Sequence, residues 1–306
     1  MARKIVVVGS SNVDLIMKMD HLPRLGETVT NAIFLQTFGG KGANTAVGTA
    51  RAGGEVYFVT CVGDDSYGHQ SIENLSRLGV HLDGVFTEQQ VASGTALIMV
   101  DSQGQNYLSV APGANYRLSP QHIDRAAELI HSAEMVLLQY EILPETLKYV
   151  IDLASRAEKK ILLNLAPARP LEDEYLAKLS VLVVNETEAE FLCGFPVDTA
   201  DHIHHAAESL LAKGPGLVII TLGAQGAYFA TQELRMHAPG FKVKAVDSTA
   251  AGDIFCGSLA VALVEGKSVL ESVRFANAAA AISVTRLGAQ PSAPGRHEIE
   301  RFLSQY

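Results

Sequence analysis

Short runs of apolar residues recur along the chain and alternate with stretches of helical periodicity. Each run is bounded by polar residues or glycine, as is typical of strands buried on both faces of a sheet. The predicted strands are 5–8, 56–62, 135–138, 160–163, 179–184 and 217–221, and the clearest predicted helices are 66–79, 119–131, 144–157 and 201–214. Strands that alternate with helices form a parallel sheet covered on both faces. The pattern therefore predicts an α/β fold.

Two regions break this alternation, because no helical pattern separates their predicted strands. These strands are 13–19, 27–38, 96–100 and 107–111, with a turn at Pro23 to Gly26 and a hairpin signal at Ser102 to Gly104. We expect them to form a small antiparallel sheet, called the lid below, built from about 13–38 and 94–112 of a single domain spanning 1–306. Its apolar faces need cover from a substrate, a second subunit or their own packing.

Composition restricts the possible partners. The chain has 306 residues, 48% of them hydrophobic, and a net charge of −9, which argues against nucleic acid as a main partner but not against a small anionic ligand. Its three cysteines lie far apart and form no CxxC pair, so neither a disulfide framework nor a zinc motif is indicated. No segment has the length of a membrane span or of a signal-peptide core, and we expect a cytoplasmic protein.

The segment 246–257 carries the most informative motif. Small residues lead to Gly252 and Asp253, which directly precede an apolar helical stretch, 254–264. The first N–H groups of a helix lack partners and attract anions. A carboxylate beside an anion site makes sense for a base that orients a hydroxyl for attack on a phosphoryl group, although helix capping alone is a simpler explanation. A carboxylate at this end of a helix should have a low pKa.

Three further segments add polar groups to the same predicted crevice. Glycines surround Lys41 in 38–47, and they allow either close approach to a ligand or a flexible connection; the spacing is not that of a Walker A loop. Asn12 and Asp14 follow the first strand, where they can hold adjacent sugar hydroxyls or form an Asx turn. Glu141 ends another strand and points to the same edge of the sheet.

Three weaker signals each have an equally simple structural explanation. Acidic residues at 185–188 can hold Mg²⁺ through water or cap a helix. The glycines of 221–226 can pass over a nucleotide phosphate or form a hairpin turn. Carbonyl groups of the loop within 283–292 can bind a monovalent cation with Asp247, or the loop can be a helix C-cap at Gly288. A fourth group, His202, His204 and His205, falls outside its helix's apolar stripe, so we expect a solvated face rather than a metal site.

Taken together and in this order, the motifs resemble the ribokinase family of sugar kinases, the PfkB group. The resemblance extends from Gly9 to Ser292, and its two hallmark segments are 39–44 and 247–253. It implies a Rossmann-like three-layer αβα core with a mostly parallel central sheet, and a β-sheet lid that is commonly shared across a homodimer. The implied partners are ATP and a small sugar, with no nucleic acid and no membrane.

The resemblance also implies a reaction, namely transfer of the γ-phosphate of ATP to the 5-hydroxyl of D-ribose. The alternatives are a kinase of the same family that acts on 2-deoxyribose, another sugar or a nucleoside, and a non-catalytic sugar-binding regulator. Asp253 would be the catalytic base, and Gly252, Ala251 and Ala250 would form the anion hole. The pentose would be held by Asn12, Asp14, Gly40, Lys41, Gly42, Asn44, Glu141 and Asp253.

The same resemblance assigns the cofactors. ATP would be contacted by Asn185, Thr221, Gly223, Gly226, Gly252 and Asn277. Mg²⁺ would be organised by Glu188, through water, and an activating K⁺ would be surrounded by Asp247, Thr249, Ser283, Arg286, Gly288 and Ser292.

Three residues depart from the family pattern. Ala250 stands where many relatives have glycine, so we expect its φ to be negative. Ile254 and Cys256 stand where polar or smaller residues are common, which affects the expected fine geometry of the nucleotide rather than the reaction type. A cysteine near a helix N-terminus can gain thiolate character, but we expect a buried, inert thiol at Cys256.

Overall fold

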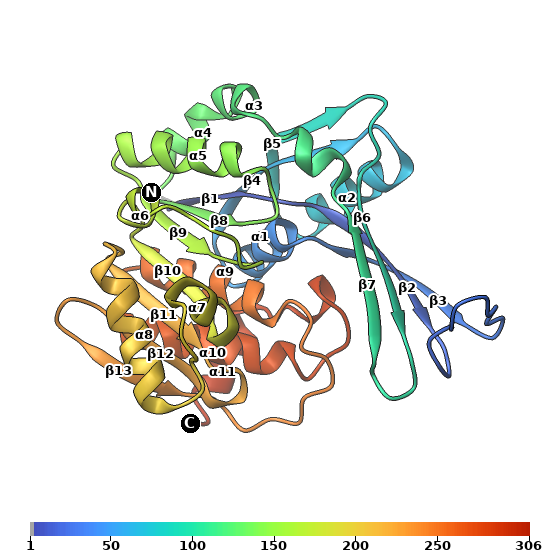
Figure 1. Cartoon of the computed structure of the whole chain (residues 1–306). Helices are drawn as coiled ribbons and strands as arrows, with labels where there is room; N and C mark the ends of the chain where they lie inside the picture. Colours follow the sequence, from blue (N-terminus) through green and yellow to red (C-terminus); the bar gives the residue numbers. More distant parts are fainter. Residues whose placement is uncertain (1–2) are drawn as a thin grey trace.

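The apolar runs form one nine-stranded sheet in the computed structural model, which describes residues 3–306 (Figure 1). Across the sheet the strands are β13 (Arg235–Pro239), β12 (Gly226–Ala230), β11 (Leu217–Thr221), β10 (Val181–Asn185), β9 (Lys160–Asn164), β8 (Met135–Gln139), β1 (Lys4–Val8), β4 (Glu55–Gly63) and β5 (His81–Glu88). The pairings of β12 with β11 and with β13 are antiparallel, and all the others are parallel. The predicted α/β class is confirmed.

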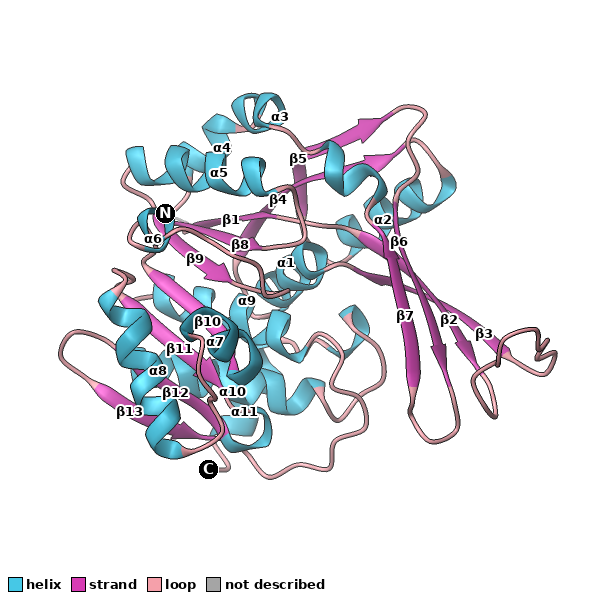
Figure 2. Cartoon of the chain, viewed as in Figure 1, coloured by secondary structure: helices cyan, strands magenta, loops and turns pink. Residues whose placement is uncertain are grey.

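Helices cover both faces of this sheet (Figure 2). One face packs against α1 (Lys41–Arg51), α2 (Ser66–Arg77), α9 (Ala251–Val264), α10 (Val269–Ser283) and α11 (Arg296–Leu303). The other packs against α3 (Pro120–Arg125), α4 (Ala127–Ser132), α5 (Pro144–Arg156), α6 (Asp173–Leu176), α7 (Glu186–Cys193) and α8 (Ala200–Ala212). The helix expected over 119–131 is thus two short helices that meet at Ala126. None of the helices in residues 3–306 has the combined length and apolarity that crossing a bilayer requires.

Side-chain alternation in the central strands explains the two layers of core. Ile5 and Val7 of β1 lie in one apolar cluster, and Val6 and Val8 lie in the other. All four side chains are at most 1% exposed. A strand buried on both faces leaves its polar neighbours only at its ends, which is where the functional residues gather.

The lid is a separate four-stranded sheet that projects from the main body (Figure 1). Its strands, in order, are β3 (Ile33–Gly39), β2 (Asn12–Lys18), β6 (Gly94–Val100) and β7 (Asn106–Ala111). The expected wholly antiparallel sheet is wrong in one pairing, because β2 and β6 run parallel. Both strands start beside the main sheet, at Asn12 and Gly94, and run outward together. The strand expected over 27–38 begins only at Ile33.

Candidate active site

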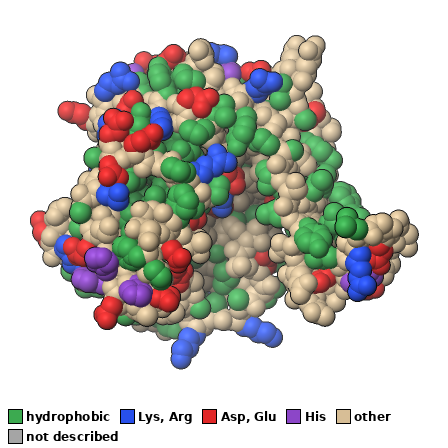
Figure 3. Space-filling model, in the orientation of Figure 1, with side chains coloured by type: hydrophobic (Ala, Val, Ile, Leu, Met, Phe, Trp, Pro, Cys, Tyr) green, Lys and Arg blue, Asp and Glu red, His purple; other side chains and the backbone are tan. Residues whose placement is uncertain are grey.

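Polar residues from five strands gather at one edge of the main sheet. Ser10 and Glu141 follow β1 and β8, whereas Asn164, Asn185 and Thr221 end or directly complete β9, β10 and β11. The carboxyl ends of parallel strands meet at one edge, where open α/β sheets bind ligands. Figure 3 shows a hollow in the middle of the visible face, between the main body and the lid.

Asp253 lies at this edge in the first turn of α9. Its side chain is 4% exposed, and its Oδ2 accepts a hydrogen bond of 3.0 Å from the Nδ2 of Asn44 on α1. The Oδ1 of Asn44 is buried and has no hydrogen-bond donor among residues 3–306. An unpaired buried acceptor beside a carboxylate is costly unless a ligand supplies the donor, as a sugar hydroxyl would.

The backbone around Asp253 presents free donors. The N–H of Ala251 donates to the carbonyl of Ser248, and that of Ile254 donates to Ala250. In the described part of the chain, the N–H groups of Gly252 and Asp253 find no acceptor, and α9 has no side-chain cap. A Cβ added to Gly252 would meet nothing within 4 Å. The helix therefore opens onto free space with two unpaired N–H groups, which is a geometry suited to an anion.

The electrostatics of Asp253 differ from the sequence-based expectation. Burial raises the pKa of this carboxyl from its ordinary value of 3.8 to about 6, against the opposing effects of the Lys41 charge and the Asn44 hydrogen bond. We expected a low pKa because of the helix N-terminus, and that expectation is wrong. The desolvation of a side chain that is nearly fully buried outweighs the stabilisation that the helix end and a neighbouring cation provide.

Lys41 connects the acidic groups of the site. It is the first residue of α1, and the charges of Asp253, Glu141 and Glu188 raise the pKa of its ammonium group. Its backbone N–H donates to the Oε2 of Glu141 at 3.0 Å, and the hydroxyl of Ser10 donates to the same oxygen at 2.5 Å. One cation among three carboxylates leaves this part of the site with excess negative charge.

Asp14 lies on the lid side of this cluster. Its side chain is 8% exposed, and burial together with the charge of Glu141 raises the pKa of its carboxyl to about 6. None of the hydrogen bonds within residues 3–306 involves this carboxyl. Glu141 also raises the pKa of Asp253, so all three carboxylates belong to one electrostatic cluster. A buried carboxylate with no donor and a perturbed pKa is characteristic of a ligand site.

Asn12 is fixed beside Asp14 at the start of β2. Its Oδ1 accepts from the Nδ2 of Asn115 at 2.7 Å, and the Oδ1 of Asn115 accepts from the N–H of Ser11 at 2.8 Å. Asn12 and Asn115 line a cavity of about 190 Å³ together with Ser10, Glu141 and Arg169. Asn12 and Asp14 are therefore strand residues rather than parts of an Asx turn.

The glycines around Lys41 have a packing role in the structure. A Cβ at Gly42 would lie 2.6 Å from the backbone of Gly9 and Ser10, and one at Gly40 would lie 2.7 Å from the N of Asn12. Gly40 also has a φ of +86°. These contacts bring the N-terminus of α1 close to the end of β1, which explains the glycines without a ligand.

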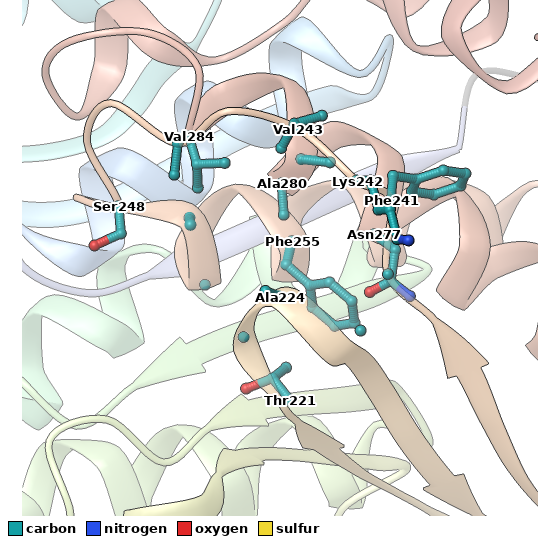
Figure 4. A pocket seen from close by; sticks show the side chains of 17 residues that line it. Thr221, Ala224, Phe241, Lys242, Val243, Ser248, Phe255, Asn277, Ala280 and Val284 are labelled. Carbon is teal, nitrogen blue, oxygen red and sulfur yellow. The ribbon is translucent and has the colours of Figure 1, made fainter.

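A larger cavity, of about 460 Å³, lies between the β11–β12 turn and helices α9 and α10 (Figure 4). The turn is a hairpin, with Gly223 at a φ of +53° and Gly226 at +97°, and both glycines line the cavity. Asn277 lines it too, and its Nδ2 donates to the carbonyl of Ala238 at 3.2 Å. Most other lining groups are apolar: Ala224, Phe241, Val243, Ala245, Phe255, Ala280, Ala281 and Val284. The cavity suits a flat, mainly apolar ring.

A polar cavity of about 210 Å³ continues from this one toward Asp253. The two cavities share Thr221, Ser248, Ala251 and Gly252. The polar cavity is also lined by Lys41, Asn164, Asn185, Glu188 and Asp253. A ligand with its ring in the first cavity and an anionic chain in the second would therefore place the end of that chain at the free N–H groups of α9.

Glu188 has a structural role that leaves one oxygen available. Its Oε2 accepts from the N–H of Asn185 at 2.9 Å, and the Oδ1 of Asn185 accepts from the N–H of Glu188 at 2.8 Å. This capping box is the simpler explanation considered for the sequence, and it is present. The other carboxylate oxygen has no donor within residues 3–306, so the residue fits a water-mediated Mg²⁺ contact as well.

The loop after α10 is tied to the segment before α9 through Asp247. Its Oδ1 accepts from the N–H and hydroxyl of Thr249 at 2.9 and 2.6 Å, and its Oδ2 accepts from the N–H of Gly288 at 2.8 Å. Burial raises the pKa of Asp247, but these bonds outweigh it, so the net pKa is lowered. The carbonyls of Asp247, Thr249, Arg286 and Gly288 accept no hydrogen bond from residues 3–306.

Free carbonyl oxygens are ligands that a monovalent cation can take, whereas other residues of the expected set are engaged. The carbonyl of Ser283 accepts from the N–H of Arg286 at 3.0 Å, and the hydroxyl of Ser292 donates to Ala289 at 2.7 Å. The guanidinium of Arg286 pairs with Glu298 at 2.5 Å. Any contribution of Arg286 to a cation site would therefore come from its backbone.

Two residues that depart from the family pattern have clear environments. Ala250, the N-cap of α9, has a φ of +62°, so the expected negative φ is wrong. Cys256 is 1% exposed, and burial raises the pKa of its thiol well above the ordinary value, in agreement with an inert thiol. The positive φ of Ala250 follows from the turn that opens the N-terminus of α9, and alanine adopts it at a cost in energy.

Sequence reasoning missed several residues of the site. Ser10, Asn115, Asn164 and Ser248 all line its cavities. Ser10 and Asn164 follow the predicted strands 5–8 and 160–163 and were recognisable as polar residues near strand ends, whereas nothing local marks Asn115. The three histidines of α8 are exposed, as expected, and His202 and His204 bond to Asp198 and Tyr228.

Comparison with known proteins agrees with this geometry. Residues 2–296 match the pfkB family of carbohydrate kinases. The chain belongs to the pfkB family of carbohydrate kinases. This carbohydrate kinase is 41% identical to a ribokinase of Bacillus subtilis, with 99% of this chain and 100% of that protein covered. It is 40% identical to a deoxyribokinase of Salmonella typhi, with 98% of each chain covered.

Among solved structures, the carbohydrate kinase is similar to an Arabidopsis thaliana ribokinase complexed with ribose and ATP. The TM-score is 0.94 at 35% identity, and 99% of each chain is covered. The expected family, the mainly parallel core and the attached β-sheet lid are therefore confirmed. Identity alone does not separate ribokinase from deoxyribokinase relatives, because the two values are nearly equal.

Proposed function

We propose that this carbohydrate kinase transfers the γ-phosphate of ATP to the 5-hydroxyl of D-ribose, giving ribose 5-phosphate. The observation that carries the proposal is the position of Asp253 beside Asn44 and beside the two unpaired N–H groups at the start of α9. Relatives named ribokinase, and a similar structure complexed with ribose and ATP, support the choice of substrates.

Asp253 acts on the sugar hydroxyl as an orienting base. Phosphoryl transfer has a loose, in-line transition state, so the hydroxyl becomes acidic only as its bond to phosphorus forms. A carboxylate with a pKa of about 6 is mostly ionised at neutral pH and is a better proton acceptor than an ordinary aspartate. Asn44 fixes its orientation, and the proton passes to an Asp253 carboxylate oxygen.

The N–H groups of Gly252 and Asp253 and the ammonium of Lys41 bind the charge of the transferring group. Removing one such electrostatic contact typically costs about a hundred- to a thousand-fold in rate. Bound Mg²⁺ would neutralise phosphate charge, held through water near Glu188. The adenine ring would occupy the 460 Å³ cavity lined by Phe255 and Asn277, and the polyphosphate would occupy the 210 Å³ cavity.

A sugar panel tests the proposal. ADP production is measured with ribose, 2-deoxyribose, hexoses and nucleosides at saturating ATP and Mg²⁺, and ribose should give the highest kcat/KM. The absence of any ADP production that depends on added sugar would contradict a sugar kinase and favour a non-catalytic regulator. Equal kcat/KM values for all sugars would be consistent with a sugar kinase but would contradict specificity for ribose.

The second candidate is a 2-deoxyribose kinase, favoured by the 40% identity to a deoxyribokinase. The unpaired carboxylate of Asp14 favours ribose, because 2-deoxyribose has one hydroxyl fewer to donate to this acceptor. A hydrogen bond to a charged group contributes about 1.5–3 kcal/mol, which corresponds to roughly a 10- to 150-fold preference. A higher kcat/KM for 2-deoxyribose would select the second candidate.

We further propose that K⁺ binds the loop around Asp247 and activates the enzyme. The free carbonyls of Asp247, Thr249, Arg286 and Gly288 lie next to the segment that opens α9, so a bound cation would fix the anion site. Rates in potassium, sodium and tetramethylammonium salts should differ, with potassium highest. Equal rates in all three salts would contradict this role.

The lid is proposed to form the contact of a homodimer. Phe34, Leu97 and Tyr107 are 55%, 53% and 58% exposed, and strand register puts them on the face opposite Asp14. Apolar side chains on an exposed sheet face are normally covered by a partner. Light scattering should give a dimer mass that falls in Leu97→Glu, and a wild-type monomer at micromolar concentration would contradict the proposal.

A further inference from the structure

A second cluster of metal-ligating side chains lies apart from the cavities described above. Cys61 of β4, Glu88 at the end of β5 and His122 of α3 each offer one ligand atom, and these atoms lie within 4.8 Å of one another. None of the three residues lines the 460, 210 or 190 Å³ cavities. We propose that Cys61, Glu88 and His122 form a binding site for a single Zn²⁺ ion.

Strand register explains why Cys61 and Glu88 meet. In the parallel pair β4–β5, Cys61 lies opposite Phe86 and Gly63 lies opposite Glu88. Residues two apart in a strand share a face, so Glu88 lies on the same face as Phe86 and is diagonal to Cys61. The ring of His122 packs on the ring of Phe86 at a centroid distance of 4.7 Å, which brings the third ligand from α3 onto this face.

Hydrogen bonds hold the ring of His122 beside Glu88 and at the N-terminus of α3. Its Nε2 lies 3.1 Å from the Oε1 of Glu88, and its Nδ1 lies 2.9 Å from the hydroxyl oxygen of Ser119. In this structure Nδ1 also accepts from the backbone N–H of Ser119 at 3.3 Å. Metal binding at Nε2 would move the ring proton to Nδ1, where the Ser119 hydroxyl oxygen would accept it and the bond from the Ser119 N–H would be lost. A second partner on the other ring nitrogen is the usual arrangement around metal-bound histidine.

The donor set selects the metal. A thiolate, an imidazole and a carboxylate are ligands that Zn²⁺ accepts in tetrahedral sites, with water as the fourth ligand. Mg²⁺ and Ca²⁺ require oxygen ligands and would not use Cys61. The thiol makes no hydrogen bond within residues 3–306, so the sulfur has no competing polar partner there.

The site can close around an ion with a small movement. Bond lengths of about 2.0–2.3 Å at a tetrahedral centre place ligand atoms roughly 3.5 Å apart, so the longest separation must shrink by at most about 1.3 Å. The Cys61 side chain is fully buried, whereas the Glu88 and His122 side chains are 32% and 15% exposed. The two partly exposed ligands form the entry side.

Binding must displace a proton from sulfur. Burial and the charge of Glu88 raise the pKa of the Cys61 thiol to about 12, with Arg125 opposing. The reaction is therefore Cys–SH plus Zn²⁺ giving Cys–S–Zn⁺ plus one H⁺, which passes to the solvent. The bound ion would pin the edge pair β4–β5 to α3, and this consequence is independent of the proposed kinase activity.

The experiment uses the full chain, freed of metal with a chelator and kept free of nucleotide. Co²⁺ is titrated as a spectroscopic substitute for Zn²⁺. We expect one equivalent to produce a thiolate-to-cobalt charge-transfer band and the intense visible bands of tetrahedral cobalt. Zn²⁺ should abolish both, and it should raise the Tm of the metal-free protein.

Variants identify the ligands. Cys61→Ser should lose the charge-transfer band, and Glu88→Gln and His122→Gln should each weaken Co²⁺ binding at least tenfold. Cys193→Ser is the matched control, because Cys193 is a free, partly exposed cysteine away from these residues, and it should bind like the wild type. If Cys61→Ser does not fold, Glu88→Gln and His122→Gln, whose side chains are partly exposed, still test the proposal.

Three results would overturn the proposal. They are the absence of a thiolate-to-cobalt band in the wild type, a band lost in Cys193→Ser but not in Cys61→Ser, and unchanged affinity in both Glu88→Gln and His122→Gln. Loss of activity plays no part in the test, so failure of the zinc site leaves the proposed kinase reaction untouched.

Discussion

Replacing the base Asp253 by asparagine should abolish turnover and stabilise the protein at the same time. The carboxylate is 4% exposed, and its pKa rises from 3.8 to about 6 even with Lys41 and Asn44 nearby. Keeping this carboxyl ionised at neutral pH therefore destabilises the folded state. Asparagine has the same shape, and its Oδ1 still accepts the hydrogen bond from Asn44, but it carries no charge.

The pKa gives the size of the effect. One pKa unit corresponds to about 1.4 kcal/mol, so the rise at Asp253 amounts to about 3 kcal/mol of destabilisation above pH 6. An acid whose pKa is raised on folding lowers the free energy of unfolding as pH rises from about 4 to 6. Asp253→Asn should therefore be more stable than the wild type by up to about 3 kcal/mol at pH 8, and by little near pH 4.

Chemical denaturation of both proteins at pH 8 and near pH 4, without sugar or nucleotide, measures this difference. Turnover of ribose should fall by at least about a hundred-fold in the same variant, while sugar binding persists. A variant less stable than the wild type at pH 8, or a stability difference that does not change with pH, would refute the electrostatic reasoning. Near-normal turnover would remove Asp253 from the mechanism.

Three other predictions follow from the same geometry. The kcat/KM for sugar should fall below pH 6 more steeply than the titration of a single group would allow, because Asp14 and Asp253 both have pKa values of about 6. Equal kcat/KM values at pH 5 and pH 7.5 would contradict this prediction. Ala250→Gly should raise the free energy of unfolding by up to about 1 kcal/mol. Relief of the strain of a positive φ, worth roughly 1–2 kcal/mol, exceeds the entropy cost of a glycine. A lower free energy of unfolding in this variant would argue against backbone strain at position 250. Gly257→Ala should lower the free energy of unfolding by roughly 1–3 kcal/mol and reduce turnover, because the new Cβ would lie 2.7 Å from the carbonyl oxygen of Thr45 and push α9 away from α1. An unchanged free energy of unfolding would mean that the two helices can separate freely.

Most of the core was predictable from local pattern. The run 135–138 and its counterparts are short and apolar throughout, and a strand buried on both faces admits little else. The lid was less predictable. Its strands were recognised because no helical pattern separates them. The parallel pairing of β2 with β6 joins segments far apart in sequence, and it follows only from the way in which both strands leave the main sheet.

The site shows the same division. Polar residues that follow a predicted apolar strand, such as Asp14 and Glu141, were recognisable because the carboxyl ends of parallel strands meet at one edge. Asn115 was not, because it reaches Asn12 only through tertiary contact. The roles of Lys41, Asn44 and Asn277 came from family resemblance rather than from any local pattern.

The sequence by itself determined which residues form strands and helices, and that a glycine and a carboxylate stand at the start of one helix. Those properties depend on near neighbours in the chain. Tertiary structure alone decided that Asp253 is weakly acidic and that Ala250 has a positive φ, both contrary to expectation. Desolvation and backbone strain depend on what packs around a residue, and local sequence does not specify those neighbours.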